Sequence, residues 1–180
     1  MPIASALLVA ALAHSPTPTP PVPARAHIRR SGTLRVPVEL ARALELFTPV
    51  GEKLWAPGWE PHFHYPADGT ARPGTAWTTR DTHSHPATET LWLLVDWNPD
   101  RHRVRYARVT PGLRTGTVEV VCRALAPTAT EVEVTYELTS LSEAGDADLA
   151  TWTEAWYRDF LAGWEKEIAS ALRGEEGRRG

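Results

Sequence analysis

The chain has 180 residues, of which 42% are hydrophobic and 23% charged, and its formal net charge is −3. This composition is typical of a globular protein with enough apolar surface for one hydrophobic core. The slightly negative charge, with arginines scattered along the chain, argues against nucleic acid as a partner.

The N-terminal segment, residues 1–26, differs in composition from the rest and is expected to lie outside the folded domain. Its apolar run, Ile3–Leu12, is too short to span a bilayer, so stable membrane insertion is not expected. Ala11–Ala13 resembles a signal-peptide cleavage site, and export is therefore one interpretation. No Lys or Arg precedes the apolar run, because the first basic residue is Arg25, and this favours a cytoplasmic protein. In that case the proline-rich Ser15–Pro23 is a disordered, stiff extension.

The first predicted strand, His27–Val36, is followed by two short helical patterns, Val38–Phe47 and Val50–Trp55. After residue 57 the chain divides into short alternating segments separated by turn residues such as Pro111-Gly112, which is typical of an antiparallel meander. Six more strands are predicted, at Gly58–Tyr65, Gly74–Arg80, Glu89–Trp97, His102–Val109, Thr115–Leu125 and Glu131–Thr139.

Alternation along the last three strands predicts which side chains face the core. The inward sets are Val104, Tyr106 and Arg108, then Val118, Val120 and Cys122, then Val132, Val134, Tyr136 and Leu138. Arg103 and Arg105 are expected in solvent. Cys122 is the only cysteine, so no disulfide can form within the chain, and we expect it to be a small buried hydrophobe.

The stretch from Asp146 to Arg173 is predicted to be one long amphipathic helix that ends at Gly174, with residues 174–180 as a flexible tail. At 100° per residue, one face carries Leu149, Trp152, Trp156, Phe160, Gly163 and Trp164. Each aromatic side chain buries about 150–250 Å². A face of this kind needs a concave sheet to cover it, and residues 27–173 are therefore predicted to form one domain.

Several segments resemble the START-like superfamily, also called SRPBCC or polyketide cyclase/dehydrase-like, and in particular its bacterial members without assigned function. The segments are Leu46–Pro66, Asp96–Pro99, Tyr106–Gly112, Thr135–Ser142 and Trp164-Glu165. With the order of elements, the resemblance covers about residues 27–172. It implies an α+β helix-grip fold, in which a curved antiparallel sheet of about seven strands wraps around a long C-terminal helix and two short helices follow the first strand.

The helix-grip fold implies a cavity between sheet and helix. Its wall is expected to consist of Trp77, Trp92, Tyr106, Val118, Val120, Tyr136, Trp152, Trp156 and Phe160, with Arg108 near the strand end. These rings either line a pocket for a lipid-like or aromatic ligand or simply fill the interior. Arg108 either holds a ligand carboxylate or forms a structural ion pair with Asp96 or Glu167. Thr79 and Thr115 offer hydroxyl groups.

We therefore expect a protein that binds or carries a small hydrophobic molecule. The alternatives are a polyketide cyclase/aromatase-like enzyme, in which Arg108 and Asp96 orient the substrate, and a protein-interaction module with an unknown partner. No catalytic residue is assigned, and the sequence leaves open whether any reaction is catalysed. Motifs for a Ser nucleophile, a phosphate loop or a dinucleotide are absent from the sequence, so no cofactor is expected.

Four histidines, His62, His64, His83 and His85, raise the question of a metal site. In the predicted hairpin the two pairs are separated by about 20 Å, and the usual Cys/His spacings of zinc sites do not occur. No metal is therefore expected.

Overall fold

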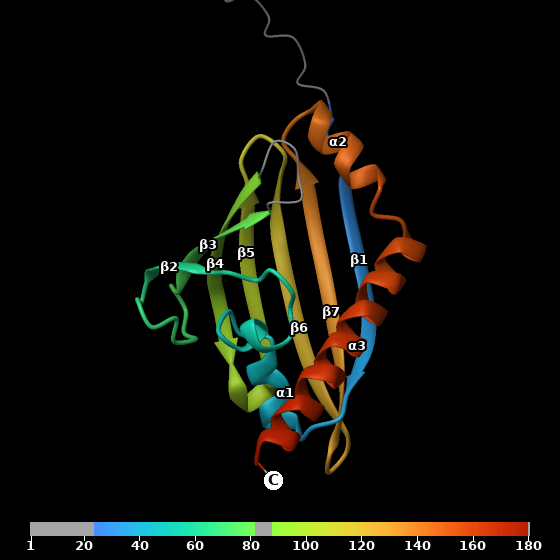
Figure 1. The fold of residues 1–180 in the computed structure, drawn as a ribbon. Helices are drawn as coiled ribbons and strands as arrows, with labels where there is room; N and C mark the ends of the chain where they lie inside the picture. The colour runs from blue at the N-terminus through green and yellow to red at the C-terminus, as the bar shows by residue number, and fades with distance from the viewer. Residues whose placement is uncertain (1–23, 82–87, 180) are drawn as a thin grey trace, which may run out of the picture.

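The computed structural model describes residues 24–81 and 88–179. Seven antiparallel strands form one curved sheet in the order β1-β7-β6-β5-β4-β3-β2 (Figure 1). The strands are β1 (His27–Val36), β2 (His62–Tyr65), β3 (Ala76–Asp81), β4 (Thr88–Asn98), β5 (Arg103–Thr110), β6 (Arg114–Ala126) and β7 (Ala129–Ser140). The helices are α1 (Leu40–Leu46), η1 (Gly51–Leu54), η2 (Pro99–Arg101), α2 (Glu143–Ala150) and α3 (Glu154–Arg179).

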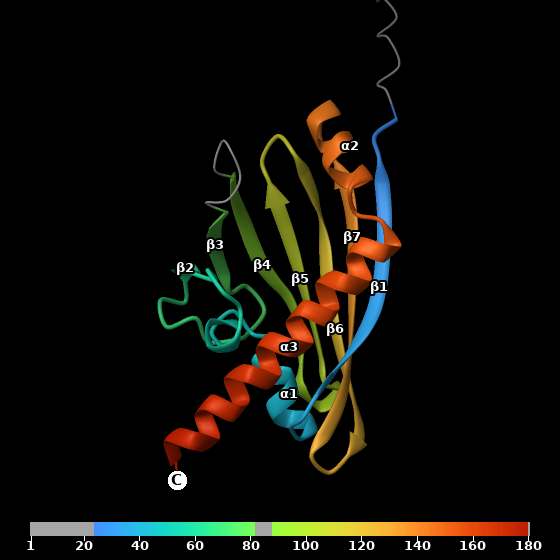
Figure 2. The ribbon, with the colours of Figure 1, turned by 45° about the vertical axis from the view of Figure 1, so that its right-hand side comes forward.

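The sheet is a meander from β2 to β7, and β1 joins it beside β7, where His27 pairs with Thr139 and Val36 with Thr130. Figure 2 shows α3 crossing the face of this curved sheet diagonally, with α1 beside the lower half of the helix. The predicted α+β helix-grip fold is confirmed. Within the described part of the chain, no helix combines the length and apolarity needed to cross a membrane.

The side chains that form the core include those that the alternation along β5, β6 and β7 predicted to face inward. Val104, Val132, Val134 and Leu138 are fully buried, and Cys122 is buried beside them. The surroundings of Cys122 raise the pKa of its thiol to about 12, because burial disfavours the thiolate. Such a thiol is unreactive, as expected for a structural cysteine.

The C-terminal helix is not continuous, which corrects the prediction of one helix from Asp146 to Arg173. It divides into α2 and α3 at residues 151–153. The hydroxyl of Thr151 donates to the carbonyl of Asp148, and the hydroxyl of Thr153 accepts from the backbone N–H of Trp156 at 3.1 Å. Threonine hydroxyls that bond to nearby backbone groups compete with the helix and favour a new start.

The face that α3 presents to the sheet also differs from the predicted one. Its fully or nearly buried side chains are Tyr157, Leu161, Ile168 and Leu172, rather than the tryptophans. Tyr157 donates its hydroxyl to the Val134 carbonyl at 2.9 Å, and Leu161 packs where Gly32 of β1 has no side chain. The break before Glu154 restarts the helix, so periodicity counted from Asp146 does not give its final orientation.

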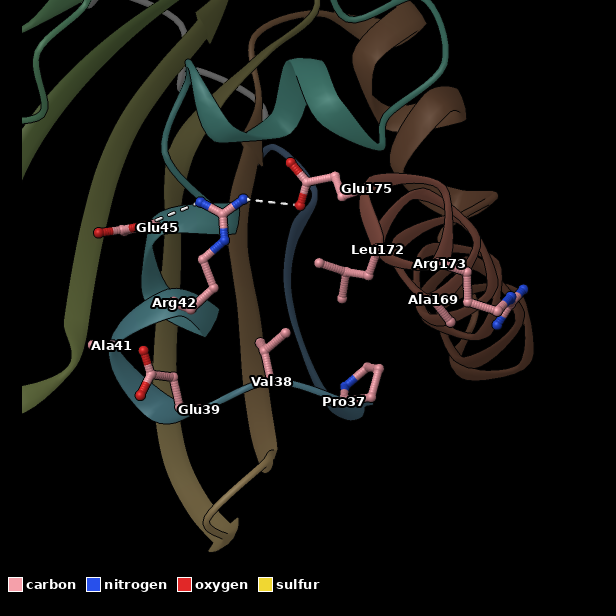
Figure 3. A pocket seen from close by; sticks show the side chains of 10 residues that line it. All are labelled: Pro37, Val38, Glu39, Ala41, Arg42, Glu45, Ala169, Leu172, Arg173 and Glu175. Carbon is pink, nitrogen blue, oxygen red and sulfur yellow. Dashed lines mark hydrogen bonds and ion pairs between the residues drawn. The ribbon is translucent and has the colours of Figure 1, made fainter. Parts of the chain in front are cut away.

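The helix also continues past the predicted stop at Gly174 and ends at Arg179. A glycine inside a helix costs about 1 kcal/mol relative to alanine. The next turn is held by Glu175, whose carboxylate lies 3.4 Å from the guanidinium of Arg42 on α1 (Figure 3). This contact between two helices was not visible in the local sequence.

Candidate functional site

A cavity of about 260 Å³ lies between the sheet, the segment around η1, and α3. Eight of the ten side chains expected around a ligand pocket are in its wall: Trp77, Trp92, Tyr106, Arg108, Val118, Val120, Tyr136 and Phe160. The large rings therefore leave a space in the interior instead of filling it completely.

Two expected wall residues, Trp152 and Trp156, are not part of this wall. Trp152 is buried at the junction of α2 and α3, where its ring lies 5.4 Å from that of Tyr136. Trp156 is 39% exposed and stacks on Phe160, with ring centroids 5.0 Å apart. Both positions differ from the prediction because the helix is broken before Glu154, whereas Phe160 and Trp164, farther along α3, do border the cavity.

Six further side chains complete the wall and were missed by the sequence prediction: Phe47, Glu52, Trp55, Ala56, Trp59 and Trp164. Five of them lie between α1 and β2, and β2 begins only at His62 instead of Gly58. The indole of Trp59 can therefore turn inward, where its N–H donates to the Pro49 carbonyl at 2.9 Å. Two tryptophans beside Pro57-Gly58 were the available signal, since loop tryptophans usually bury their rings.

The polar ends of Trp55, Tyr106 and Trp92, like that of Trp59, bond to neighbouring groups, so that the faces of these rings are left to the cavity. Trp55 donates to the Leu46 carbonyl at 2.7 Å, and the Tyr106 hydroxyl donates to the Phe47 carbonyl at 2.6 Å. Trp92 donates to the hydroxyl of Thr79 at 2.9 Å, which uses one of the two hydroxyls considered for ligand binding. These bonds fix the ring orientations before any ligand arrives.

Arg108 is the basic side chain in the wall, and it is only 8% exposed. Its guanidinium carbon lies 4.6 Å from the ring centre of Trp92 and 6.0 Å from that of Tyr136, as in cation–π contacts. Burial, the main cause, lowers the pKa of Arg108 to about 10, so the group is still charged at neutral pH. The one hydrogen bond of its side chain within the described residues, to the hydroxyl of Thr110, is long at 3.5 Å.

The expected ion pair of Arg108 with Asp96 or Glu167 does not form. A register shift between Leu94 and Asp96 places the Asp96 carboxylate 3.7 Å from Arg103, with 42% of its side chain exposed. Glu167 lies on the exposed side of α3. Thr115, the other hydroxyl considered, donates to the Arg108 carbonyl at 3.2 Å.

Glu52 is the acidic side chain in the wall. It follows α1 in η1, and part of its surface stays open because it borders the cavity. Burial raises the pKa of its carboxyl group well above the ordinary value of 4.5. The cavity therefore combines a cationic guanidinium and a carboxyl group that favours its neutral, proton-donating form.

The histidines considered for a metal site do not add a metal-binding group to this cavity. The rings of His62 and His64 lie 5.1 Å apart, whereas His83 and His85 fall outside the described residues. Across residues 24–81 and 88–179, no three His, Cys, Asp or Glu side chains are grouped closely enough to hold a metal ion.

A wider hollow of about 660 Å³ lies between α1 and the end of α3 (Figure 3). Arg42 is its central charge, and this guanidinium is already paired with Glu45 at 3.2 Å and Glu175 at 3.4 Å. The rest of the wall combines the charged Glu39 and Arg173 with apolar side chains: Pro37, Val38, Ala41, Ala169 and Leu172. The interior cavity is the better candidate because its polar groups are not paired with one another.

The sequence matches no protein-family model and no curated protein sequence. Solved structures share the fold. Norcoclaurine synthase from Thalictrum flavum superposes with a TM-score of 0.62 and 11% identity, over 86% of this chain and 99% of that one. Another structure of that enzyme contains dopamine and hydroxybenzaldehyde.

Two further solved structures are similar to this chain. For major latex-like protein 151 from Panax ginseng the TM-score is 0.60 at 13% identity, over 80% of this chain and 96% of that one. An uncharacterized protein from Rhizobium leguminosarum gives 0.55 at 12% identity, over 83% and 97% of the two chains. The similarities show the helix-grip fold, and at these identities they show the fold alone.

Proposed function

We propose that this protein is a START-like binding protein that holds a small aromatic or otherwise hydrophobic molecule in the interior cavity. The observation that supports the proposal is a preformed space walled by aromatic rings, four of which have their polar ends bonded to neighbouring groups. An apolar cavity with few polar groups is the common form of a small-molecule site. The similar fold of a synthase that was solved with two aromatic molecules is consistent with it.

The size of the cavity limits the ligand. An apolar cavity of about 150 Å³ accepts a benzene ring. A space of about 260 Å³ therefore suits a substituted molecule of one or two rings. A long acyl chain or a four-ring compound would need the wall to move, so the aromatic part of the original expectation is favoured over the lipid-like part.

Glu52 and Arg108 favour one alternative, a cyclase/aromatase-like enzyme. A neutral carboxyl group can protonate a carbonyl oxygen while a guanidinium stabilises negative charge, and both groups border the same cavity. The Asp96 side chain does not take part, because it lies on the other face of the sheet beside Arg103. A protein-interaction module has less support, because the interior contains a cavity that binding to a protein partner on the surface would not need.

Titration with 2-naphthamide, a neutral two-ring probe, tests the binding proposal. We expect saturable binding by isothermal titration calorimetry. Val118→Phe adds a ring inside the cavity and should weaken binding at least about 10-fold, a loss near 1.4 kcal/mol. Val95→Phe makes the same change at an exposed position of β4 and should leave the affinity unchanged.

Trp156→Ala is a second control, because this ring lies outside the cavity wall and its removal should leave the affinity for 2-naphthamide unchanged. Absence of saturable binding by the wild-type protein, or equal losses for the two Val→Phe variants, would contradict the proposed site.

A further inference from the structure

The proposed function leaves open the chemistry of the ligand, and Arg108 bears on it. A guanidinium has five N–H donors. In the part of the chain that the structure describes, the guanidinium makes one long contact, to Thr110, and its buried Nε atom has no hydrogen-bond partner. Among the described residues, no carboxylate lies within 4.0 Å of this guanidinium. A buried charge in this state is strongly unfavourable, and an anionic partner would relieve it.

The polar neighbours of Arg108 do not supply that partner. Arg114, a cation that lowers the pKa of Arg108, is paired with Asp148, an anion that raises it. The charges of Arg114 and Asp148 largely cancel each other, so this ion pair does not compensate the charge of Arg108. The phenol of Tyr136 is a weaker acid than usual, because burial raises its pKa to about 12, and it therefore stays neutral.

A second unsatisfied donor belongs to the same wall. The indole N–H of Trp77 is buried and has no partner in the described part of the chain. Trp77 stacks on Trp92 with ring centroids 6.0 Å apart, and Trp92 is the ring beneath the Arg108 guanidinium. Unpaired donors in the wall call for a ligand rich in acceptor atoms.

Glu52, the acidic group of the cavity, does not oppose an anion while it is protonated. Its carboxyl group forms no hydrogen bond with the described residues, and burial raises its pKa, which favours the neutral form. A neutral carboxyl group does not repel a ligand carboxylate and can itself donate a hydrogen bond.

From this arrangement we propose that the ligand is a small aromatic acid of one or two rings, whose carboxylate binds the Arg108 guanidinium and whose ring lies among the wall aromatics. This inference rests on the proposed function and narrows its ligand class. The guanidinium offers two parallel N–H groups to a carboxylate, a geometry that neutral ligands cannot use fully.

The test compares 2-naphthoate with 2-naphthamide, which differ in charge and hardly in size, by calorimetry at pH 6. The wild-type protein should bind the acid about 10- to 150-fold more tightly, the range given by one charge-assisted hydrogen bond. Arg108→Gln should abolish this preference while leaving the affinity for the amide nearly unchanged. Arg105→Gln is the matched control, because Arg105 is on the same strand but on the other face of the sheet, and its preference should remain.

The outcomes separate the two proposals. Binding of neither probe would remove the proposed function. Equal binding of both probes by the wild-type protein would leave the binding function standing and overturn the assignment of the acid. Thermal unfolding of each variant shows whether it is folded. If Arg108→Gln does not fold, the wild-type preference decides, together with Arg108→Lys, which should retain part of the preference because it keeps the charge.

Discussion

Burial acts on Arg108 and Glu52 in the same sense, because it disfavours the charged form of each. It lowers the pKa of Arg108 to about 10 and raises that of Glu52 well above 4.5. Arg108 stays charged at neutral pH, whereas Glu52 is shifted toward its neutral form. The cavity therefore has a net positive character that an apolar wall alone would not give.

The raised pKa of Glu52 makes the free energy of unfolding depend on pH in a direction that can be measured. Below pH 4.5, Glu52 is protonated in both the folded and the unfolded chain, so it costs nothing. As the pH rises toward the raised pKa of the folded state, the unfolded chain ionises first and stability falls by about 1.4 kcal/mol per pH unit. We therefore expect Glu52→Gln to match the wild-type protein near pH 4 and to be more stable at pH 8, in urea unfolding.

Glu167→Gln is the control for this measurement, since Glu167 is exposed on α3. Its stability relative to the wild-type protein should not change between pH 4 and 8. A Glu52→Gln variant that follows the same flat profile would show that the Glu52 carboxyl group is solvated in the folded state.

At the scale of single residues, the sequence predicted the inward position of Arg108 but not its lack of a partner. Alternation along β5 fixes the direction of the side chain. The register shift between Leu94 and Asp96 turns the Asp96 carboxylate to the opposite face of the sheet, and no local sequence pattern predicts this shift. Glu52 was missed for a related reason: its burial depends on α3 and the sheet, which are distant in sequence.

The break between α2 and α3 sets the orientation of α3 and therefore determines which of its side chains reach the cavity. It lets Tyr157 and Leu161 pack on the sheet while Phe160 and Trp164 border the cavity. The other end of α2 is tied to the first strand, because Asp146 accepts hydrogen bonds from Arg25 and from the Ala26 N–H, both at 2.8 Å. These contacts extend the packed domain before residue 27.

Thr153→Ala tests the start of α3. The Thr153 hydroxyl accepts from the backbone N–H of Trp156, and loss of such an N-cap costs about 1 kcal/mol. We expect a corresponding decrease in the free energy of unfolding, measured in urea. Ser170→Ala, at an exposed position within the helix, should have no effect or stabilise slightly. An unchanged stability of Thr153→Ala would show that the break is set by packing alone.

At the scale of elements, strands were predicted more accurately than helices. β1 agrees residue for residue with its prediction, because alternation and the flanking residues both mark it. The helix break was missed because Thr151 and Thr153 fit a helical pattern, and only their hydrogen bonds show otherwise. The continuation of α3 past Gly174 depends on Arg42 of α1, so no local reading of the C-terminus would have found it.

The molecule as a whole is held by β1 and α3, which are far apart in sequence and pack together. The first and the last strand are neighbours in the sheet, and α3 lies across them (Figures 1 and 2). The order of the predicted elements and the aromatic helix, together with the resemblance to the START-like superfamily, predicted this architecture. The shape of the cavity was not predictable, because it depends on how the segment 47–59 fills one end of the sheet.

Removal of α3 tests whether the sheet needs this helix in order to fold. Its four buried side chains, Tyr157, Leu161, Ile168 and Leu172, contribute about 6–12 kcal/mol together, which is comparable to the whole stability of a typical domain. A chain that ends at Thr151 should therefore show no cooperative thermal transition in circular dichroism. A chain that ends at Arg173 loses only the last turns and the Arg42–Glu175 ion pair, so it should unfold cooperatively with stability reduced by no more than about 1 kcal/mol. A cooperative transition of the shorter chain near the wild-type temperature would mean that the sheet holds itself together, and that α3 serves the cavity rather than the fold.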